Sequence, residues 1–157
     1  MTRVLPIAAF LVVTACGGQS RPPQLTGELG DVVVQASFAG EPAPASFNGP
    51  LMLDSISFGR LAVITQQAVV GSDRPVEMVD PRDVLECPDQ APCHVRGDRM
   101  FMSVWDAVAA DDTLAMVVSR TYNVERLYTM TTSVIHRMKF QRVPGGWRLT
   151  ERRRLPT

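Results

Sequence analysis

The C-terminal third of this 157-residue chain alternates apolar and polar residues with the two-residue period of a β-strand. The apolar positions of residues 128–143 share one face, which also holds His136: Tyr128, Met130, Val134, Met138 and Phe140. The polar positions share the other face: Thr129, Thr131, Ser133, Arg137, Lys139 and Gln141. After the turn Pro144-Gly145-Gly146, Trp147 and Leu149 alternate with Arg148, Thr150 and Arg152. The pattern predicts a hairpin with one buried face and one wet, cationic face.

Two further strands precede this hairpin and extend the same sheet. They are Met100–Val108 and Thr113–Thr121, with the turn Ala110-Asp111-Asp112 between them. Turns at such regular spacing indicate an antiparallel meander. With 45% hydrophobic and 20% charged residues, the chain is able to bury a core. We therefore expect an α+β fold in which a curved antiparallel β-sheet, the C-terminal meander, carries one or two short helices in a single small domain.

The residues before the meander predict shorter elements. Leu51–Phe58 alternates in part and predicts a strand. Asp80–Glu86 predicts a helix of one or two turns, because Asp80 suits the N-cap and Pro81 suits the first helical position. Two other segments fit either a strand or a short helix: Asp31–Ala39 and Leu61–Val70.

The N-terminus has the features of an export signal. After Arg3, the uncharged run Val4–Val13 is too short to span a membrane. It ends in Val13-Thr14-Ala15-Cys16, which resembles the lipobox of bacterial lipoproteins. The resemblance implies that residues 1–15 are a lipoprotein signal peptide. It also implies that Cys16 carries a diacylglycerol, becomes the new N-terminus and is usually N-acylated as well.

The same resemblance implies a location. The protein would be exported and held on the lipid bilayer of the cell envelope, since two or three acyl chains anchor a protein stably. Gly17 follows the lipidated cysteine, so the outer membrane is the expected site where the host has one, and the cell membrane otherwise. An ordinary secretory signal with a chance cysteine is the alternative.

The mature chain divides into a tether and a domain. Residues 16–30 are rich in Gly, Pro and polar residues and predict a lipidated flexible tether, so the globular α+β domain covers residues 31–157. Cys87 and Cys93 then remain as an even pair in an oxidising compartment and predict a disulfide. A metal site that includes His94 is the alternative, although the C-x-x-C-H spacing of covalent haem attachment is not met.

Charge is distributed unevenly along the chain. The formal net charge is zero, which argues against a strongly cationic nucleic-acid binder. Residues 17–112 contain 6 Arg and 14 Asp or Glu, whereas residues 113–157 contain 9 basic and 2 acidic residues. Six of these basic residues predict a patch for an anionic partner or for the acidic half of the same domain: Arg137, Lys139, Arg148, Arg152, Arg153 and Arg154.

The hairpin Phe140–Leu149 resembles the last strands of cystatin-like and NTF2-like α+β rolls, over about a third of the chain. In those families, helices pack in the concave face of a curved sheet and form a pocket. The resemblance implies a pocket that contains His136, Tyr128 and Phe140. The chain departs from the pattern because it lacks a long amphipathic N-terminal helix, and no catalytic residue carries over.

Several shorter patterns suit ordinary structural roles better than functional ones. The methionines of Met100-Phe101-Met102 suit Cu(I), but also an adaptable core. Arg96-Gly97-Asp98 suits a turn rather than adhesion. Four acidic residues that recur every three positions suit a solvated face better than a Ca²⁺ site: Asp80, Asp83, Glu86 and Asp89.

The sequence therefore favours a non-catalytic envelope lipoprotein that binds a protein or an anionic envelope component. None of the nucleophile, phosphate-binding or metalloprotease motifs is present. We expect no enzymatic activity, no cofactor, no metal and no nucleic-acid partner. Two alternatives remain open, which are a small-molecule-binding or enzymatic NTF2-like roll with a pocket near His136, and a purely structural lipoprotein.

Overall fold

A computed structural model of the chain describes residues 25–44, 47, 49–59, 76–89, 93–123 and 131–157. The described helices are α1 (Leu29–Phe38), α2 (Ser55–Phe58) and α3 (Pro81–Val84). The described strands are β1 (Thr26–Gly27), β2 (Leu51–Asp54), β3 (Val76–Val79), β4 (Leu85–Glu86), β5 (His94–Val95), β6 (Met100–Ala110), β7 (Thr113–Asn123), β8 (Thr131–Val143) and β9 (Gly146–Leu155). Among these residues, no helix is long and apolar enough to cross a membrane.

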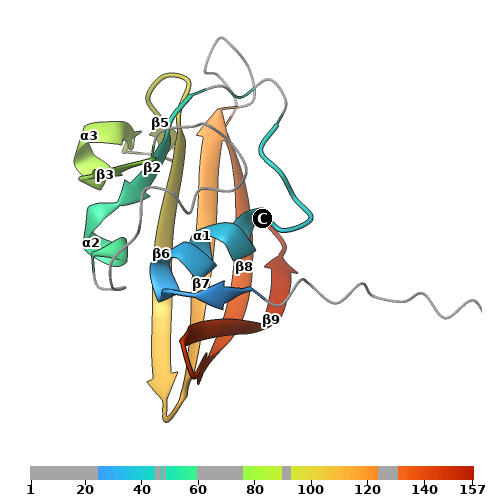
Figure 1. Cartoon of the computed structure of the whole chain (residues 1–157). Coiled ribbons are helices and arrows are strands. Elements are labelled where there is room, and N and C mark those ends of the chain that lie inside the picture. The colour runs from blue at the N-terminus through green and yellow to red at the C-terminus, as the bar shows by residue number, and fades with distance from the viewer. Residues whose placement is uncertain (1–24, 45–46, 48, 60–75, 90–92, 124–130) are drawn as a thin grey trace, which may run out of the picture.

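The predicted C-terminal meander is confirmed. Strands β6, β7, β8 and β9 pair antiparallel in sequence order and form the centre of a curled sheet, shown in Figure 1. The predicted strand at residues 128–143 is described from Thr131 onward, and its first three residues lie outside the described part of the chain. Within it, Val134, Met138 and Phe140 are buried while Arg137 and Lys139 are exposed, as the alternation predicts.

The expected antiparallel meander is part of a larger, mixed sheet. Its order is β1-β9-β8-β7-β6-β2-β3, and β2 runs parallel to both β6 and β3. Parallel neighbours need a crossover connection rather than a tight turn. The chain from β2 to its parallel neighbour β6 includes α2, β3, α3 and the small β4–β5 sheet. The described residues also form three short helices instead of one or two.

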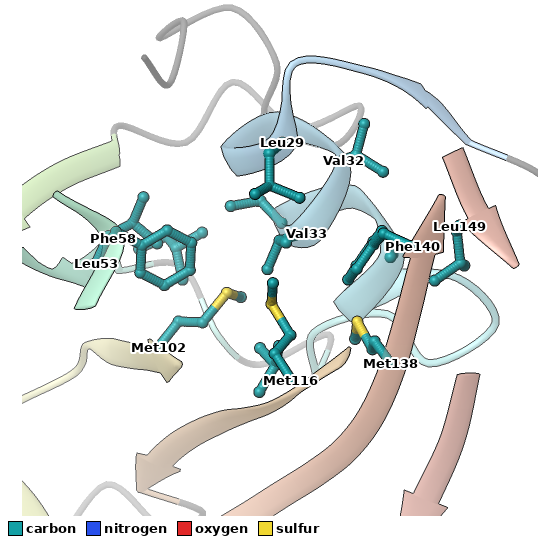
Figure 2. Packing of buried hydrophobic residues seen from close by; sticks show 14 of the residues in the cluster. Leu29, Val32, Val33, Leu53, Phe58, Met102, Met116, Met138, Phe140 and Leu149 are labelled. Atoms are coloured by element: carbon teal, nitrogen blue, oxygen red, sulfur yellow. The ribbon is translucent and has the colours of Figure 1, made fainter. Parts of the chain in front are cut away.

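Helix α1 resolves the ambiguous segment at residues 31–39. Its buried apolar residues include Leu29, Val32, Val33 and Ala36, which follow the spacing of one helix face. The helix lies across the concave face of the curled sheet, as seen in Figure 1. Figure 2 shows the resulting core, in which this helix face meets side chains of the sheet: Met102, Met116, Met138, Phe140 and Leu149. The methionines of β6 are therefore core residues, consistent with the preferred interpretation.

The fold includes residues that the sequence pattern assigns to the tether. Residues 25–30 were expected at the end of a flexible tether, but Thr26 pairs with Arg148 and Gly27 with Trp147 at the edge of the sheet. Leu149 N donates to Leu25 O over 3.0 Å, and Leu29 is buried in the core. Burial of Leu29 and the edge hydrogen bonds explain why these residues belong to the fold.

Two short caps explain the boundaries of α2 and α3. The predicted strand Leu51–Phe58 ends at Asp54, whose side chain accepts a hydrogen bond from Ile56 N over 2.9 Å and starts α2. The helix predicted over Asp80–Glu86 is confirmed for Pro81–Val84 (α3), with Asp80 accepting from Arg82 N over 2.9 Å, whereas Leu85–Glu86 form strand β4. The other ambiguous segment, Leu61–Val70, lies outside the described residues.

The predicted disulfide joins Cys87 and Cys93, with an S–S distance of 2.09 Å. It follows β4 and precedes β5, which pair antiparallel, so the covalent bond closes this small hairpin. His94 Nε2 lies 3.1 Å from Glu86 Oε2 across the same pair of strands. Because both sulfurs are in the disulfide, neither is a thiolate ligand for the alternative metal site.

Candidate functional site

An irregularity in the pairing of β8 and β9 decides which arginines face the concave side. Phe140 lies opposite Leu149, but the next residue, Lys139, lies opposite Glu151, so Thr150 is an extra residue in β9. Thr150 Oγ1 donates to Lys139 O over 3.1 Å. A bulge of this kind shifts the alternation by one residue. Residues after Thr150 therefore face the opposite side from the one predicted.

Arg152 and Arg154 are consequently on the inner face of the sheet. Arg152 lies opposite Met138, and Arg154 lies opposite His136. The sequence pattern placed Arg152 on the wet face with Arg148, and this prediction is wrong because a two-residue period cannot include the extra residue in β9. The side chain of Arg152 is only 8% exposed, whereas that of Arg154 is 58% exposed.

The two arginines meet three other polar side chains, which we call the Glu41 cluster. Its members come from three strands of the sheet and from the turn after α1: Glu41, Arg120, His136, Arg152 and Arg154. Glu41 Oε2 lies 3.6 Å from Arg120 Nη2 and 3.3 Å from His136 Nε2. Glu41 Oε1 lies 3.6 Å from Arg152 Nη2 and 3.7 Å from Arg154 Nη1. Each carboxylate oxygen thus lies between two nitrogen-bearing groups.

Arg120 forms the base of the cluster and is 2% exposed. Its Nη1 donates to the backbone oxygen of Glu41 over 2.9 Å, and its guanidinium carbon lies 4.4 Å from the centroid of the Phe38 ring. The second contact is a cation–π interaction. Burial lowers the pKa of Arg120 from 12.5 to about 10, and Glu41 opposes this change in part. The side chain is therefore still a cation at neutral pH.

His136 is neutral at pH 7. Burial lowers its pKa from 6.5 to about 4, the positive charge of Arg152 lowers it further, and Glu41 opposes both effects. Arg152 Nη2 lies 2.9 Å from His136 Nε2. Since a guanidinium only donates, Nε2 is the acceptor and the ring proton is assigned to Nδ1. This tautomer turns an unshared electron pair toward Glu41, so the carboxylate and the imidazole do not form a favourable hydrogen bond.

The cluster is unbalanced in charge and in hydrogen bonding. Among the residues that the structure describes, three guanidinium groups face one carboxylate, so the positive charges of the cluster exceed the negative ones by two. Within the described part of the chain, the buried atoms Arg120 Nε and His136 Nδ1 have no hydrogen-bond partner. The surplus of positive charge favours the binding of an anion. Guanidinium groups suit carboxylates and phosphates in particular, because their donors form a planar fork.

The rest of the predicted basic patch lies on the outer face or at its margin. Arg137 and Arg153 lie opposite each other and are exposed. Lys139 Nζ forms an ion pair with Glu151 Oε2 at 2.6 Å. Arg148 donates to Gln141 over 3.4 Å. The six predicted residues thus do not form one surface, and the acidic half of the chain contributes Glu41 to the inner group.

The predicted pocket residues do not share one environment. Phe140 has no exposed surface and belongs to the apolar core, whereas His136 belongs to the Glu41 cluster. Tyr128 lies outside the described residues. Sequence reasoning did not identify Arg120, although its position two residues after Val118 on β7 indicates an inward-facing arginine. Glu41 had no sequence signal, because it lies in a loop brought to the sheet only by the fold.

The remaining patterns add no second site. His, Cys, Asp and Glu side chains of the described residues form no group of three or more that could hold a metal ion. Asp80 is instead bound by Arg82 at 2.7 Å, and this hydrogen-bonded ion pair lowers the pKa of Asp80 to about 2. No family model, curated protein or solved structure matches this chain. The geometry of the Glu41 cluster is therefore the basis for assigning a function.

Proposed function

We propose that this chain is a non-catalytic binding module of the bacterial cell envelope that recognises an anionic group with the Glu41 cluster. The observation that supports the proposal best is the convergence of Arg120, Arg152 and Arg154 on one carboxylate. Charges that are partly removed from water interact more strongly than charges on an open surface. A surplus of two such charges has a physical reason to attract an anion.

The accessibility of the cluster is graded. Arg120 and His136 are almost fully buried, Glu41 is 29% exposed, and Arg154 is 58% exposed. An anion that approaches from solvent would meet Arg154 first and Arg152 next. Arg120 lies behind them, donates to the backbone of Glu41 and contributes positive potential. This gradation suits a site at the surface of the sheet better than a closed internal network.

The contacts of His136 favour binding over catalysis. Its Nε2 accepts from a guanidinium, and its low pKa keeps the ring neutral near pH 7. A general base would need an available ring nitrogen beside the group whose proton it removes. We therefore assign His136 the role of positioning Arg152 rather than a role in proton transfer.

The proposed location follows from the lipobox. Lipidation of Cys16 would hold the module on the envelope, in the outer membrane where one exists. The Cys87–Cys93 disulfide supports export, because such bonds persist in oxidising compartments. Cys16→Ser should release the protein from isolated membranes into the soluble fraction. Retention of Cys16→Ser on membranes after a high-salt wash would contradict the anchor.

Anion recognition is tested with matched arginine variants of the full chain in detergent. Sodium acetate and sodium phosphate are titrated at constant ionic strength and followed by NMR. Arg154→Gln should weaken binding of the better probe by roughly tenfold, the usual size of one lost charge-assisted hydrogen bond. Arg153→Gln, the adjacent residue on the outer face, is the matched control and should stay within about twofold of wild type. Equal losses in both variants, or no binding of either probe, would refute the proposal.

A further inference from the structure

The carboxylate of Glu41 lies among the nitrogen atoms of the cluster at distances longer than those of tight hydrogen bonds. Its four contacts with the cluster range from 3.3 to 3.7 Å. Charge-assisted hydrogen bonds between nitrogen and carboxylate oxygen are usually about 2.7–2.9 Å. The carboxylate is therefore attracted to the cluster without being locked into it.

The backbone of Glu41, in contrast, is held on both sides of the residue. Its N–H donates to Phe38 O over 3.0 Å, and its carbonyl accepts from Arg120 over 2.9 Å. Gly40, just before it, has a φ of +71°, which fixes the direction in which the chain leaves α1. Because the main chain is anchored, the side chain is able to leave the cluster by rotation about its own bonds while the loop stays in place.

The cluster distinguishes the two oxygens of its occupant. Arg120 Nη2 is the donor beside one oxygen, and Arg152 Nη2 and Arg154 Nη1 are the donors beside the other. Such an arrangement fits a planar anion with two equivalent oxygens, which is the geometry of a carboxylate. A tetrahedral phosphate would place its additional oxygens outside this pattern.

We propose that the Glu41 cluster is a carboxylate-binding site that Glu41 fills as an internal competitor, and that an external carboxylate replaces the Glu41 side chain between Arg120 on one side and Arg152 and Arg154 on the other. The inference rests on the proposed function and specifies its ligand. The carboxylate would be that of a small organic acid or of a peptide C-terminus. Rotation of Glu41 into solvent exchanges one carboxylate for another, so the charge of the cluster is unchanged.

The first test removes the competitor. Glu41→Gln keeps the size of the side chain, and the backbone contacts to Phe38 and Arg120 do not depend on its charge. Full-length protein in detergent is titrated with sodium acetate and followed through the ring resonances of His136. We expect affinity for acetate to rise at least roughly tenfold, because an internal competitor lowers apparent affinity by the fraction of time that it fills the site. The matched control is Glu151→Gln, whose ion pair with Lys139 lies on the outer face, and its affinity should equal that of wild type.

The second test uses the unaltered protein, so it does not depend on the variant folding. With ¹³C-labelled protein, saturating acetate should move the side-chain carboxyl resonance of Glu41 toward the position of a solvated glutamate, while that of Glu151 stays fixed. The remaining probes are a short peptide with a free C-terminal carboxylate and the same peptide with a C-terminal amide. Tighter binding of the free peptide than of acetate would assign the ligand to a peptide terminus, and equal binding would assign it to a small acid.

The outcomes separate this inference from the proposed function. If wild type binds acetate through Arg154 but Glu41→Gln binds it no more tightly and the Glu41 resonance does not move, competition is refuted and anion binding stands. If phosphate binds more tightly than acetate, or the peptide amide binds as well as the free acid, the carboxylate assignment is refuted. If wild type and Glu41→Gln both bind neither anion, the proposed function and the inference fail together.

Discussion

Arg152 Nη2 lies 2.9 Å from His136 Nε2, an arrangement that requires the imidazole to be unprotonated. The two residues come from adjacent strands, and the extra residue Thr150 turns Arg152 toward the concave face. Burial first, and then the positive charge of Arg152, lower the pKa of His136 to about 4. The hydrogen bond also links the protonation of one side chain to the integrity of the whole cluster.

Stability should decrease as pH falls from about 6.5 to 4. The folded state disfavours protonated His136, whose pKa is lowered from 6.5 to about 4, whereas the unfolded chain binds the proton near pH 6.5. The contribution of His136 is thus fully present above pH 6.5 and is lost as pH falls through 4, with an order of magnitude of about 3 kcal/mol. Urea denaturation of wild type and His136→Gln measures this difference. His94→Gln is the control for loss of a histidine, and a wild-type curve with the same slope as His136→Gln would contradict the expectation.

Deletion of Thr150 should preserve the Glu41 cluster. Without the extra residue, Leu149 and Glu151 become neighbours with regular alternation, and Arg152 still faces inward. The deletion loses the hydrogen bond from Thr150 to Lys139 O, at a cost of about 1 kcal/mol. Acetate affinity should stay within about twofold of wild type, as measured by NMR titration.

Deletion of Arg153 is the matched comparison for that experiment. It removes one residue after the bulge and moves Arg154 to the outer face, where it no longer faces Glu41. Acetate affinity should then fall roughly tenfold. If the two deletions have the same effect, the side-chain orientation that we assign to the bulge is wrong.

Gly146→Ala should detach β1 from β9. A Cβ atom at residue 146 would lie only 2.4 Å from Gly27 O, and the residue has a φ of +135°. Gly145→Ala is a matched control, because residue 145 also has a positive φ but a Cβ atom there would meet nothing within 4 Å. Hydrogen exchange at Leu149 N, which donates to Leu25 O, should accelerate in Gly146→Ala and change little in Gly145→Ala. Equal protection in both variants would show that β1 tolerates the clash.

Replacement of Cys87 and Cys93 by serine should lower the free energy of unfolding by about 2.4 kcal/mol, the loop-closure value for a seven-residue loop. The reason is that the covalent bond restricts the unfolded chain more than the folded one. Urea denaturation of the oxidised wild type and of the double serine variant measures the loss. Reduced wild-type protein should match the variant, and a variant as stable as the oxidised protein would contradict this account.

The sequence was most informative where a regular period decides the structure. Strand β8 was predictable because its apolar and polar residues alternate, which fixes both the element and its buried face. Strands β6 and β7 were predictable as runs rich in apolar and β-branched residues that are bounded by turn residues, and β9 from the turn before it and the alternation of its first residues. The short helix α3 was predictable from a capping Asp followed by Pro. Helix α1 remained undecided, because its three consecutive valines favour a strand locally and only packing on the sheet selects the helix.

The candidate site was less predictable, because it depends on interruptions of that period. The bulge at Thr150 reverses the predicted orientation of Arg152. A threonine at this position does not by itself indicate a bulge. Glu41 reaches the cluster from the turn after α1. Its contact with Arg120 joins residues that are 79 positions apart in the sequence. Patterns within short windows do not contain such long-range contacts.

The edge strand β1 also has a mechanical consequence. Thr26 and Gly27 attach the start of the fold to β9, and α1 begins only two residues later, with Leu29 buried in the core. Displacement of Leu25 from the sheet edge would therefore break the β1–β9 hydrogen bonds before it disturbs α1. Because β1 has only two residues, it would separate from β9 while α1 stays packed in the core.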